Sequence, residues 1–179
     1  MFNPLRLFYR YKKPKYRLHF NDGAYVCNPN DKSPIHVRFL RNGNVEYEVT
    51  LQPGHWGKTN LHYLVPWEIE ITDRFGGLII IHKLDLAGKR VRINIDSKSL
   101  GDTLAWIPQV ARFAHAHPDT EVYCGHFWPQ LGFTDCYPNI HFIEPDKSLQ
   151  DTYATFAIGF YFGERCPNMH PADPRTVPL

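Results

Sequence analysis

The sequence lacks the features that define several large classes of protein. It has neither a Gly-x-Gly-x-x-Gly run nor a Gly-x-x-x-x-Gly-Lys-Ser/Thr run, so the dinucleotide fingerprint and the P-loop are both excluded. The longest aliphatic run is 78–81, far shorter than the roughly 20 apolar residues of a membrane-spanning helix. The first residues contain no apolar segment typical of a secretory signal. We therefore expect a cytoplasmic protein with no membrane span.

Cysteine is scarce and no two cysteines are close in sequence. The pattern has no Cys-x-x-Cys pair, which argues against a disulfide framework or a zinc site and favours reduced cytosolic thiols. His115 and His117 are two residues apart and do not share a helix face, so they make a poor metal pair. No metal site and no cofactor is predicted within this span. The four cysteines are Cys27, Cys124, Cys136 and Cys166.

Charge of one sign is concentrated only at the N-terminus. The whole chain of 179 residues has a formal net charge of +2 and is 43% hydrophobic and 21% charged, a composition typical of a globular protein. Residues 1–15 form a basic arm with interleaved aromatic residues. Such an arm is compatible with stacking on nucleic acid or with a solvated or subunit-contacting terminus. Because the chain lacks domain-wide basicity, no nucleic-acid partner is predicted.

Residues 16–88 show the pattern of an antiparallel β domain. Strand-like segments with alternating apolar and polar residues flank three turn signals, at 21–23, 41–44 and 73–77. Six short strands closed on themselves would make a small β-barrel or sandwich. Trp56 is expected to anchor this barrel, and Asp22 is interpreted as a turn residue rather than a catalytic one.

From residue 89 the pattern changes to strands alternating with helices, which predicts parallel βαβ units. We expect strands at 90–96, 121–124 and 140–143, a helix over about 102–117, a short helix near 128–134 and an apolar segment at 153–162. The predicted fold is therefore α+β overall: a barrel or sandwich followed by an incomplete Rossmann-like α/β domain over 89–179. Because few strands are laid down before a proline-rich tail, the chain is expected to be the front part of a longer enzyme.

The loop between the strand at 90–96 and the following helix is the candidate site. Asp102 would lie at the carboxyl end of a strand and beside a helix N-terminus, where open α/β sheets bind ligands and where N–H groups favour negative charge. One alternative competes with a functional role: Asp102 simply caps a helix that starts at Thr103. Ser99 is a competing cap, and a cap at Ser99 would free Asp102 for other work.

Taken in order, several short motifs resemble the bacterial autotransporter heptosyltransferases. The Gly-Asp pair followed at a fixed interval by Pro is also similar to the lipopolysaccharide heptosyltransferases, a related family. The matching stretches cover nearly the whole chain: Phe20-Asn-Asp-Gly-Ala24, Leu51-Gln-Pro-Gly-His-Trp56, Leu100-Gly-Asp-Thr-Leu-Ala-Trp-Ile-Pro108, Phe127-Trp128, Tyr137-Pro138, Phe142-Ile-Glu-Pro145, Tyr153-Ala-Thr155, Asp173-Pro-Arg175 and Val177-Pro-Leu179.

This resemblance implies a cytoplasmic GT-B glycosyltransferase, with a homo-oligomer as the candidate assembly, that transfers heptose from ADP-heptose to serine residues of an autotransporter adhesin. It implies that Asp102 is the catalytic base, which is chemically reasonable because the attacking hydroxyl must lose a proton. Ser97, Ser99, Gly101 and Thr103 are then candidate donor or acceptor contacts.

The resemblance also implies that the donor nucleotide and a cysteine-ligated iron site belong to a second Rossmann-like domain outside these 179 residues. Trp128 is a candidate for lining the acceptor or sugar cleft, although a core role is also open for any tryptophan. Two further functions stay open: a non-enzymatic acceptor-binding or assembly module, and an inactive gene remnant.

Overall fold

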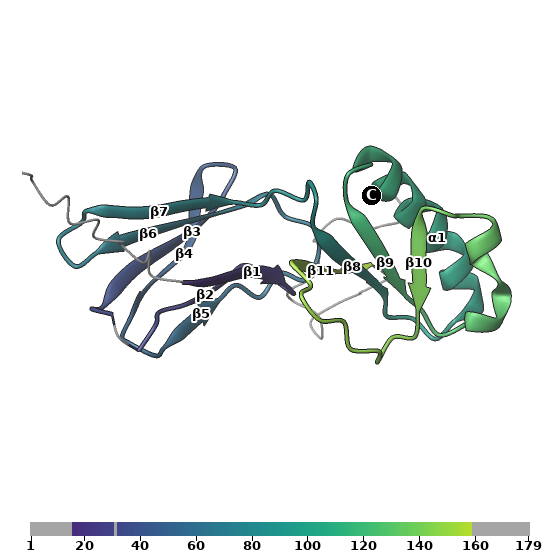
Figure 1. Cartoon of the computed structure of the whole chain (residues 1–179), viewed down its shortest axis with the longest axis horizontal. Helices are drawn as coiled ribbons and strands as arrows, with labels where there is room; N and C mark the ends of the chain where they lie inside the picture. The colour runs from purple at the N-terminus through teal and green to yellow at the C-terminus, as the bar shows by residue number, and fades with distance from the viewer. Residues whose placement is uncertain (1–15, 31, 159–179) are drawn as a thin grey trace, which may run out of the picture.

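The computed structural model describes residues 16–30 and 32–158 and contains two sheets and one α-helix (Figure 1). The predicted basic arm and the motifs at 173–175 and 177–179 lie outside the described residues. Among the described residues, no helix combines the length and apolarity needed to span a bilayer. The elements are β1 (Arg17–Asn21), β2 (Tyr25–Cys27), β3 (Ile35–Arg41), β4 (Asn44–Leu51), β5 (Trp56–Lys58), β6 (Trp67–Asp73), β7 (Leu78–Lys83), β8 (Arg90–Ile95), α1 (Leu100–Ala116), β9 (Glu121–Gly125), the 3-10 turns η1 (Pro129–Leu131) and η2 (Phe133–Asp135), β10 (Ile140–Ile143) and β11 (Ala154–Ile158).

The first sheet has four antiparallel strands in the order β4-β3-β6-β7. The β3–β4 and β6–β7 hairpins confirm two of the predicted turns. The alternating sequence of β3 and β6 places apolar residues on the covered face, while the other face carries charge pairs such as Arg38–Glu70 and Lys83–Glu68. The sheet is open, with β4 and β7 as its edges.

The predicted closed barrel is wrong for the residues that the structure describes, because neither sheet closes on itself. β1, β2 and β5 do not join the four-stranded sheet. They extend a second sheet instead, in the order β10-β9-β8-β11-β1-β2-β5. Phe20 pairs with Ala154 and Asn21 with Thr155, and this parallel pairing of β1 with β11 carries hydrogen bonds across the division predicted at residue 88. The division into domains itself stays a prediction.

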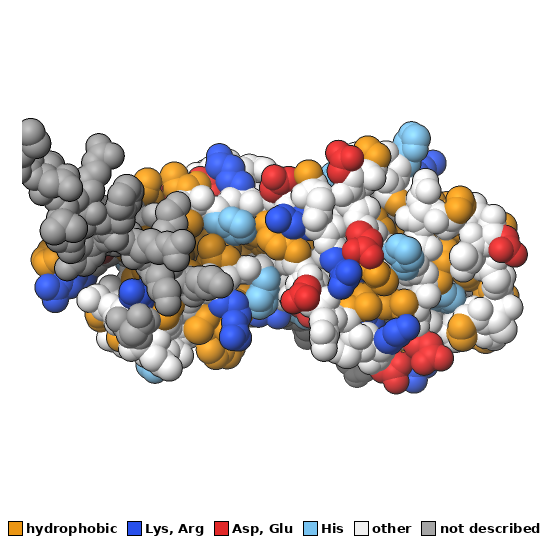
Figure 2. All heavy atoms as spheres, in the orientation of Figure 1, with side chains coloured by type: hydrophobic (Ala, Val, Ile, Leu, Met, Phe, Trp, Pro, Cys, Tyr) orange, Lys and Arg blue, Asp and Glu red, His pale blue; other side chains and the backbone are white. Residues whose placement is uncertain are grey.

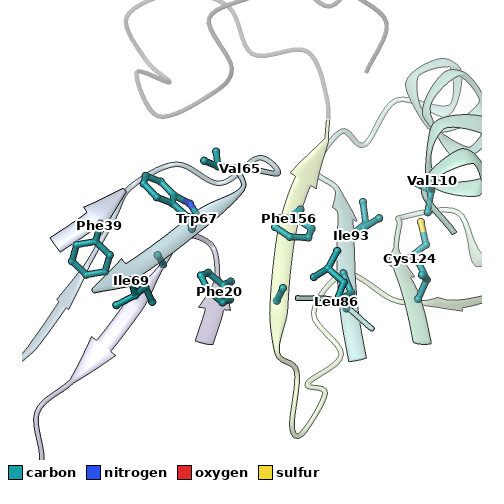
Figure 3. Close-up of a cluster of buried hydrophobic side chains, with 14 of the residues drawn as sticks. Phe20, Phe39, Val65, Trp67, Ile69, Leu86, Ile93, Val110, Cys124 and Phe156 are labelled. Carbon is teal, nitrogen blue, oxygen red and sulfur yellow. The ribbon is translucent and has the colours of Figure 1, made fainter. Parts of the chain in front are cut away.

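One hydrophobic core runs through both parts of the molecule. Figure 3 shows Phe39, Ile69 and Trp67 on the side of the four-stranded sheet and Phe156 and Ile93 on the side of the parallel strands. Near the far end of the seven-stranded sheet, a Cβ atom added at Gly57 in β5 would lie 3.2 Å from Val49 and 3.5 Å from Leu51 of β4, so the two sheets are in close contact there.

Trp56 does not have the expected anchoring role. Its side chain is 61% exposed, and its ring stacks on Tyr25 with a centroid distance of 5.8 Å. The reason is the alternation of β5: Trp56 and Lys58 face outward, whereas Gly57 faces the core. On the visible face of the molecule, acidic and basic side chains are interspersed (Figure 2).

Candidate functional site

The loop between β8 and α1 positions the candidate acid. Ser99 is the N-cap of α1, and its Oγ atom accepts a hydrogen bond from the Asp102 backbone N–H at 3.4 Å. The helix therefore begins at Leu100, two residues earlier than expected. Asp102 lies in the first turn of the helix, and the interpretation of Asp102 as the cap is wrong. Serine is at least as good an N-cap as aspartate, so this register satisfies the helix and leaves the carboxylate available.

Three hydrogen bonds join Ser97, Ser99 and Asp102 in a closed ring. The backbone N–H of Ser99 donates to Ser97 Oγ at 3.0 Å. The hydroxyl of Ser97 in turn donates to Asp102 Oδ2 at 2.6 Å. The third bond runs from the Asp102 backbone N–H to Ser99 Oγ. Asp102 is therefore a partly exposed carboxylate held by one oxygen, at a helix N-terminus that favours its charge.

The other two predicted loop residues have different surroundings. Thr103 is fully buried, and its hydroxyl donates to the Ser99 carbonyl at 3.0 Å, so it anchors the helix to the loop. Gly101 is exposed, and the nearest atom to an added Cβ would be Ser99 Oγ at 3.7 Å. Nothing in this packing requires a glycine at position 101. Of the predicted loop set, the structure brings only Ser97 and Ser99 into hydrogen-bond contact with Asp102.

Trp128 is hydrogen-bonded to the loop that carries Ser97 and Ser99. Its indole Nε1–H donates to the carbonyl of Lys98 at 3.2 Å, which ties the loop after β9 to the loop after β8. Its backbone N–H donates to His126 Nδ1 at 3.2 Å. His126 is buried, and this burial lowers the pKa of its imidazole. The short helix predicted near 128–134 is in fact the two 3-10 turns η1 and η2.

Sequence reasoning did not assign a role to two neighbours of Trp128. Phe127 is 38% exposed, and the Lys98 ammonium lies 5.6 Å from the centroid of its ring. An exposed aromatic ring with a cation beside it can contact the apolar face of a sugar and a negative group together. Phe127 belongs to the Phe127-Trp128 motif, and Lys98 lies just before the motif at 100–108. Each residue follows a predicted strand, and this position was the signal that could have identified them.

The loop that positions the candidate acid follows β8, the strand at which the strand order of the sheet reverses. β9 and then β10 follow on one side of β8, while β11 lies on its other side, and all four strands are parallel. In open α/β sheets ligands bind at the carboxyl ends of the strands at such a point. Ser97 and Asp102 follow the carboxyl end of β8 and thus occupy this position.

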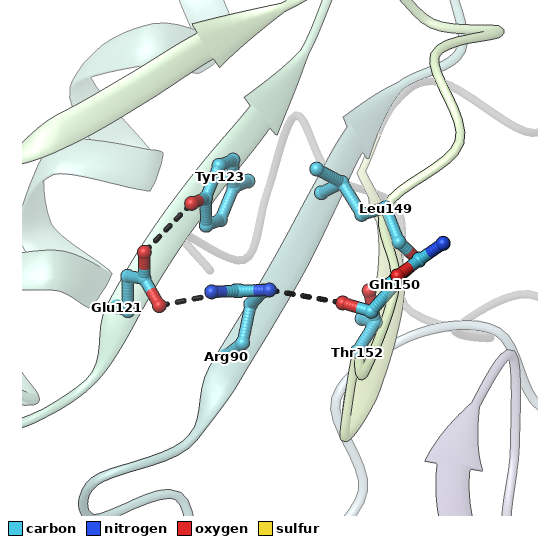
Figure 4. A network of polar contacts seen from close by, with 6 residues as sticks. All are labelled: Arg90, Glu121, Tyr123, Leu149, Gln150 and Thr152. Carbon is cyan, nitrogen blue, oxygen red and sulfur yellow. Dashed lines mark hydrogen bonds and ion pairs between the residues drawn. The ribbon is translucent and has the colours of Figure 1, made fainter.

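A second polar network lies on the face of the sheet away from α1 and is structural (Figure 4). The Arg90 guanidinium donates to Glu121 Oε2 at 3.0 Å and to the carbonyl of Gln150 at 3.0 Å. The Tyr123 hydroxyl also donates to Glu121, at 2.6 Å. These two bonds, the one from Tyr123 first, lower the pKa of Glu121. The network secures the segment before β11.

The described residues do not fit a metal centre. Within 16–30 and 32–158, no group of three or more His, Cys, Asp or Glu side chains is placed to hold a metal ion. Cys124 is buried in the core, and burial raises the pKa of its thiol to about 12, which disfavours the thiolate that a metal needs. Cys27 and Cys136 are also free thiols, and Cys166 lies outside the described part of the chain.

Comparison with known proteins identifies a consistent set of relatives. No family model matches the chain. The chain is 28% identical over 163 residues to the inactive autotransporter heptosyltransferase BimC of Burkholderia thailandensis, covering 90% of this chain and 38% of BimC. It is 29% identical over 161 residues to two autotransporter heptosyltransferases, BAHTCr of Citrobacter rodentium and TibC of Escherichia coli, covering 88% of this chain and 39% of each. The chain thus spans about two fifths of the length of the curated relatives it matches.

The fold is also similar to that of a solved relative. The crystal structure of the dodecameric iron-containing heptosyltransferase TibC in complex with ADP-D-β-D-heptose superposes with a TM-score of 0.78 at 28% identity, covering 90% of this chain and 42% of that chain. A second TibC structure, from enterotoxigenic E. coli, gives 0.76 at 30% identity over the same shares. The mixed α+β fold of this chain is therefore that of the matched part of TibC.

Proposed function

We propose that this chain, whose homologues are autotransporter heptosyltransferases, is the N-terminal portion of a protein O-heptosyltransferase. The enzyme would transfer heptose from ADP-heptose to serine residues of an autotransporter adhesin. The main support for the proposal is the length of chain over which sequence and fold are similar to heptosyltransferases. Sequence and fold match heptosyltransferases along about nine tenths of this chain, rather than over one common motif.

In this proposal Asp102 is the general base. The serine oxygen of the acceptor forms a bond to the anomeric carbon of the heptose, and the bond from that carbon to the β-phosphate oxygen of ADP breaks. The serine proton passes to Asp102, for which the carboxylate must be ionised. Oδ2 is engaged by the Ser97 hydroxyl, and Oδ1, which takes no part in the hydrogen-bonded ring, is the atom proposed to accept the proton.

The surroundings of Asp102 suit this reaction. Lys98 would offer a positive charge to the departing diphosphate, while Trp128 and Phe127 would lie along the sugar or the acceptor. Ser99 contributes indirectly, because its hydroxyl caps the helix whose first turn holds the acid. The Thr103 hydroxyl holds the loop to α1, and Gly101 adds no side chain to the exposed surface beside Asp102.

Finer parts of the proposal concern architecture and assembly. The strand order β10-β9-β8-β11 is that of the first four strands of a doubly wound dinucleotide-binding sheet, which supports a Rossmann-like half of a GT-B enzyme. We place the protein in the cytoplasm and propose that it forms homo-oligomers, as the dodecameric state of TibC suggests. TibC contains iron; since the described residues here do not fit an iron site, we assign that site to a region that these residues do not include.

The direct test is sugar transfer by the full-length protein encoded by the gene that contains this chain. The protein is incubated with adhesin expressed separately, in the presence and in the absence of ADP-heptose, and peptides of the adhesin are analysed by mass spectrometry. The proposal expects serine-containing peptides to gain the mass of one or more heptoses only when the donor is present. No mass gain at any donor concentration would contradict it.

One observation favours a second function, a non-enzymatic module that binds the acceptor or mediates assembly. One of the relatives, BimC, is itself an inactive autotransporter heptosyltransferase, so the likeness extends to a protein without the activity. Stable binding of the adhesin by the full-length protein without any transfer would support this module. The absence of both binding and transfer would instead indicate an inactive gene remnant.

A further inference from the structure

We propose that Ser97 is a positioning residue that orients the carboxylate of Asp102 for proton transfer. This role rests on the proposed function, because it requires Asp102 to be the base. It assigns to Ser97 a task other than contact with the donor or the acceptor.

The direction of the Ser97 hydroxyl is determined by its two partners. Its oxygen accepts the Ser99 backbone N–H at 3.0 Å, so the hydroxyl hydrogen is free to point to Asp102 Oδ2, 2.6 Å away. A separation of 2.6 Å is typical of a hydroxyl bonded to an ionised carboxylate, one of the stronger hydrogen bonds in proteins. The terminal torsion of an aspartate is otherwise soft. This one bond therefore decides where Oδ1 faces.

The loop that carries Ser97 is itself held at two points. Trp128 Nε1–H donates to the carbonyl of Lys98 at 3.2 Å, and the hydroxyl of Thr103 donates to the carbonyl of Ser99 at 3.0 Å. The two residues that follow Ser97 are thus hydrogen-bonded to the loop after β9 and to α1. A positioned hydroxyl on a held loop transmits that fixed geometry to the carboxylate. A displacement of about 1 Å at such a group can cost up to about 10²-fold in rate.

A purely structural role for Ser97 would use its hydroxyl differently from the positioning role. Serine hydroxyls often accept the N–H of the residue two positions on, which stabilises a turn without any functional consequence. That role uses only the acceptor capacity of Ser97. The bond to Asp102 uses its donor capacity, so the two roles are separable by kinetics together with stability.

The test compares four variants of the full-length protein: Ser97→Ala, Ser97→Thr, Asp102→Asn and the exposed-loop control Ser148→Ala. Transfer to the adhesin is measured as kcat and as KM for ADP-heptose, and each variant is melted in parallel. We expect Ser97→Ala to lower kcat by about 10- to 100-fold with a nearly unchanged KM, because the base is misaligned while the donor is still bound. Ser97→Thr, which keeps the hydroxyl, should restore most of kcat, and Ser148→Ala should match the parent.

Three results would overturn the assignment. A normal kcat in Ser97→Ala beside a strong loss in Asp102→Asn would remove the role of Ser97 and leave the proposed function intact. A loss in Ser97→Ala that is fully accounted for by a lowered melting temperature, with normal kcat at temperatures where the variant is folded, would make Ser97 a turn residue only. A normal kcat in Asp102→Asn would refute the base assignment itself, and the role of Ser97 with it.

Discussion

The turn between β1 and β2 offers a stringent test of the packing between this turn and the segment that follows β5. Gly23 has a φ of +117°, which L side chains rarely adopt, and it is buried. A Cβ atom added there would lie 2.4 Å from the carbonyl oxygen of Thr59 and 2.8 Å from its Oγ1 atom. The same Oγ1 accepts the backbone N–H of Ala24 at 2.9 Å, so Thr59 cannot move away without losing that hydrogen bond.

Two costs therefore add in Gly23→Ala. Forcing alanine into a left-handed backbone conformation costs about 1–2 kcal/mol, and overpacking a buried site costs about another 1–3 kcal/mol. Gly43 provides the matched control. Its φ is +79°, but nothing lies within 4 Å of an added Cβ. Gly43→Ala should therefore carry only the conformational cost of about 1–2 kcal/mol.

The measurement is the free energy of unfolding of the 179-residue chain in urea, followed by tryptophan fluorescence. We expect Gly23→Ala to be less stable than Gly43→Ala by about 1–3 kcal/mol, with the same denaturant dependence. Equal losses in the two variants would refute the close contact between the β1–β2 turn and Thr59.

Three further predictions concern acid stability, thiol chemistry and activity. Burial lowers the pKa of His126 below its usual 6.5, so the unfolded state takes up a proton at a pH where the folded state does not. The stability from this group is therefore complete above about pH 6.5 and falls as the pH drops below that value; the melting temperature should decline from pH 7.5 to 5.5, and less steeply in His126→Gln. Iodoacetamide should label the exposed Cys136 rapidly, whereas Cys124, buried and with a pKa of about 12, should react only after unfolding, as peptide mapping would show. The isolated 1–179 chain should transfer little or no heptose if, as the resemblance implies, the donor is held mainly by a second domain outside these residues, because the donor is then not brought into near-attack geometry; efficient transfer in a mass-spectrometric assay would contradict this.

Local chemistry made part of the fold predictable. Asp22, Gly23, Asn42 and Gly43 all have positive φ values, and these residue types in turn positions are what indicated the hairpins. The strands on either side pair as expected because their alternation matches a half-buried antiparallel sheet.

The larger arrangement depended on contacts between distant residues. β1 pairs with β11, which lies more than 130 residues away, and no local pattern specifies such a partner. β5 has only three residues, too few to show a period, and so it was not predicted. Because β1 and β2 pair within the seven-stranded sheet and not with the four-stranded sheet, the predicted barrel does not close.

The position of the candidate site could be predicted better than its geometry. A strand followed by small residues, an acid and a helix predicts Asp102 beside a helix N-terminus after a strand, and the structure places it in the first turn of α1, after β8. The hydrogen bond from Ser97 could not be anticipated, since it depends on the conformation of the loop. The tether from Trp128 to the carbonyl of Lys98 joins segments 30 residues apart and was equally outside the reach of local patterns.

The central claim is that Asp102 is the general base of a heptosyltransferase. It is tested most directly by the turnover of Asp102→Asn in the full-length protein, with Asp119→Asn, an exposed acid beyond the other end of α1, as the control. Loss of general-base assistance should lower turnover by about 10²–10⁴-fold, while the melting temperature stays close to that of the parent because Ser99, not Asp102, caps the helix. Turnover of Asp102→Asn within a few-fold of the parent would contradict the account.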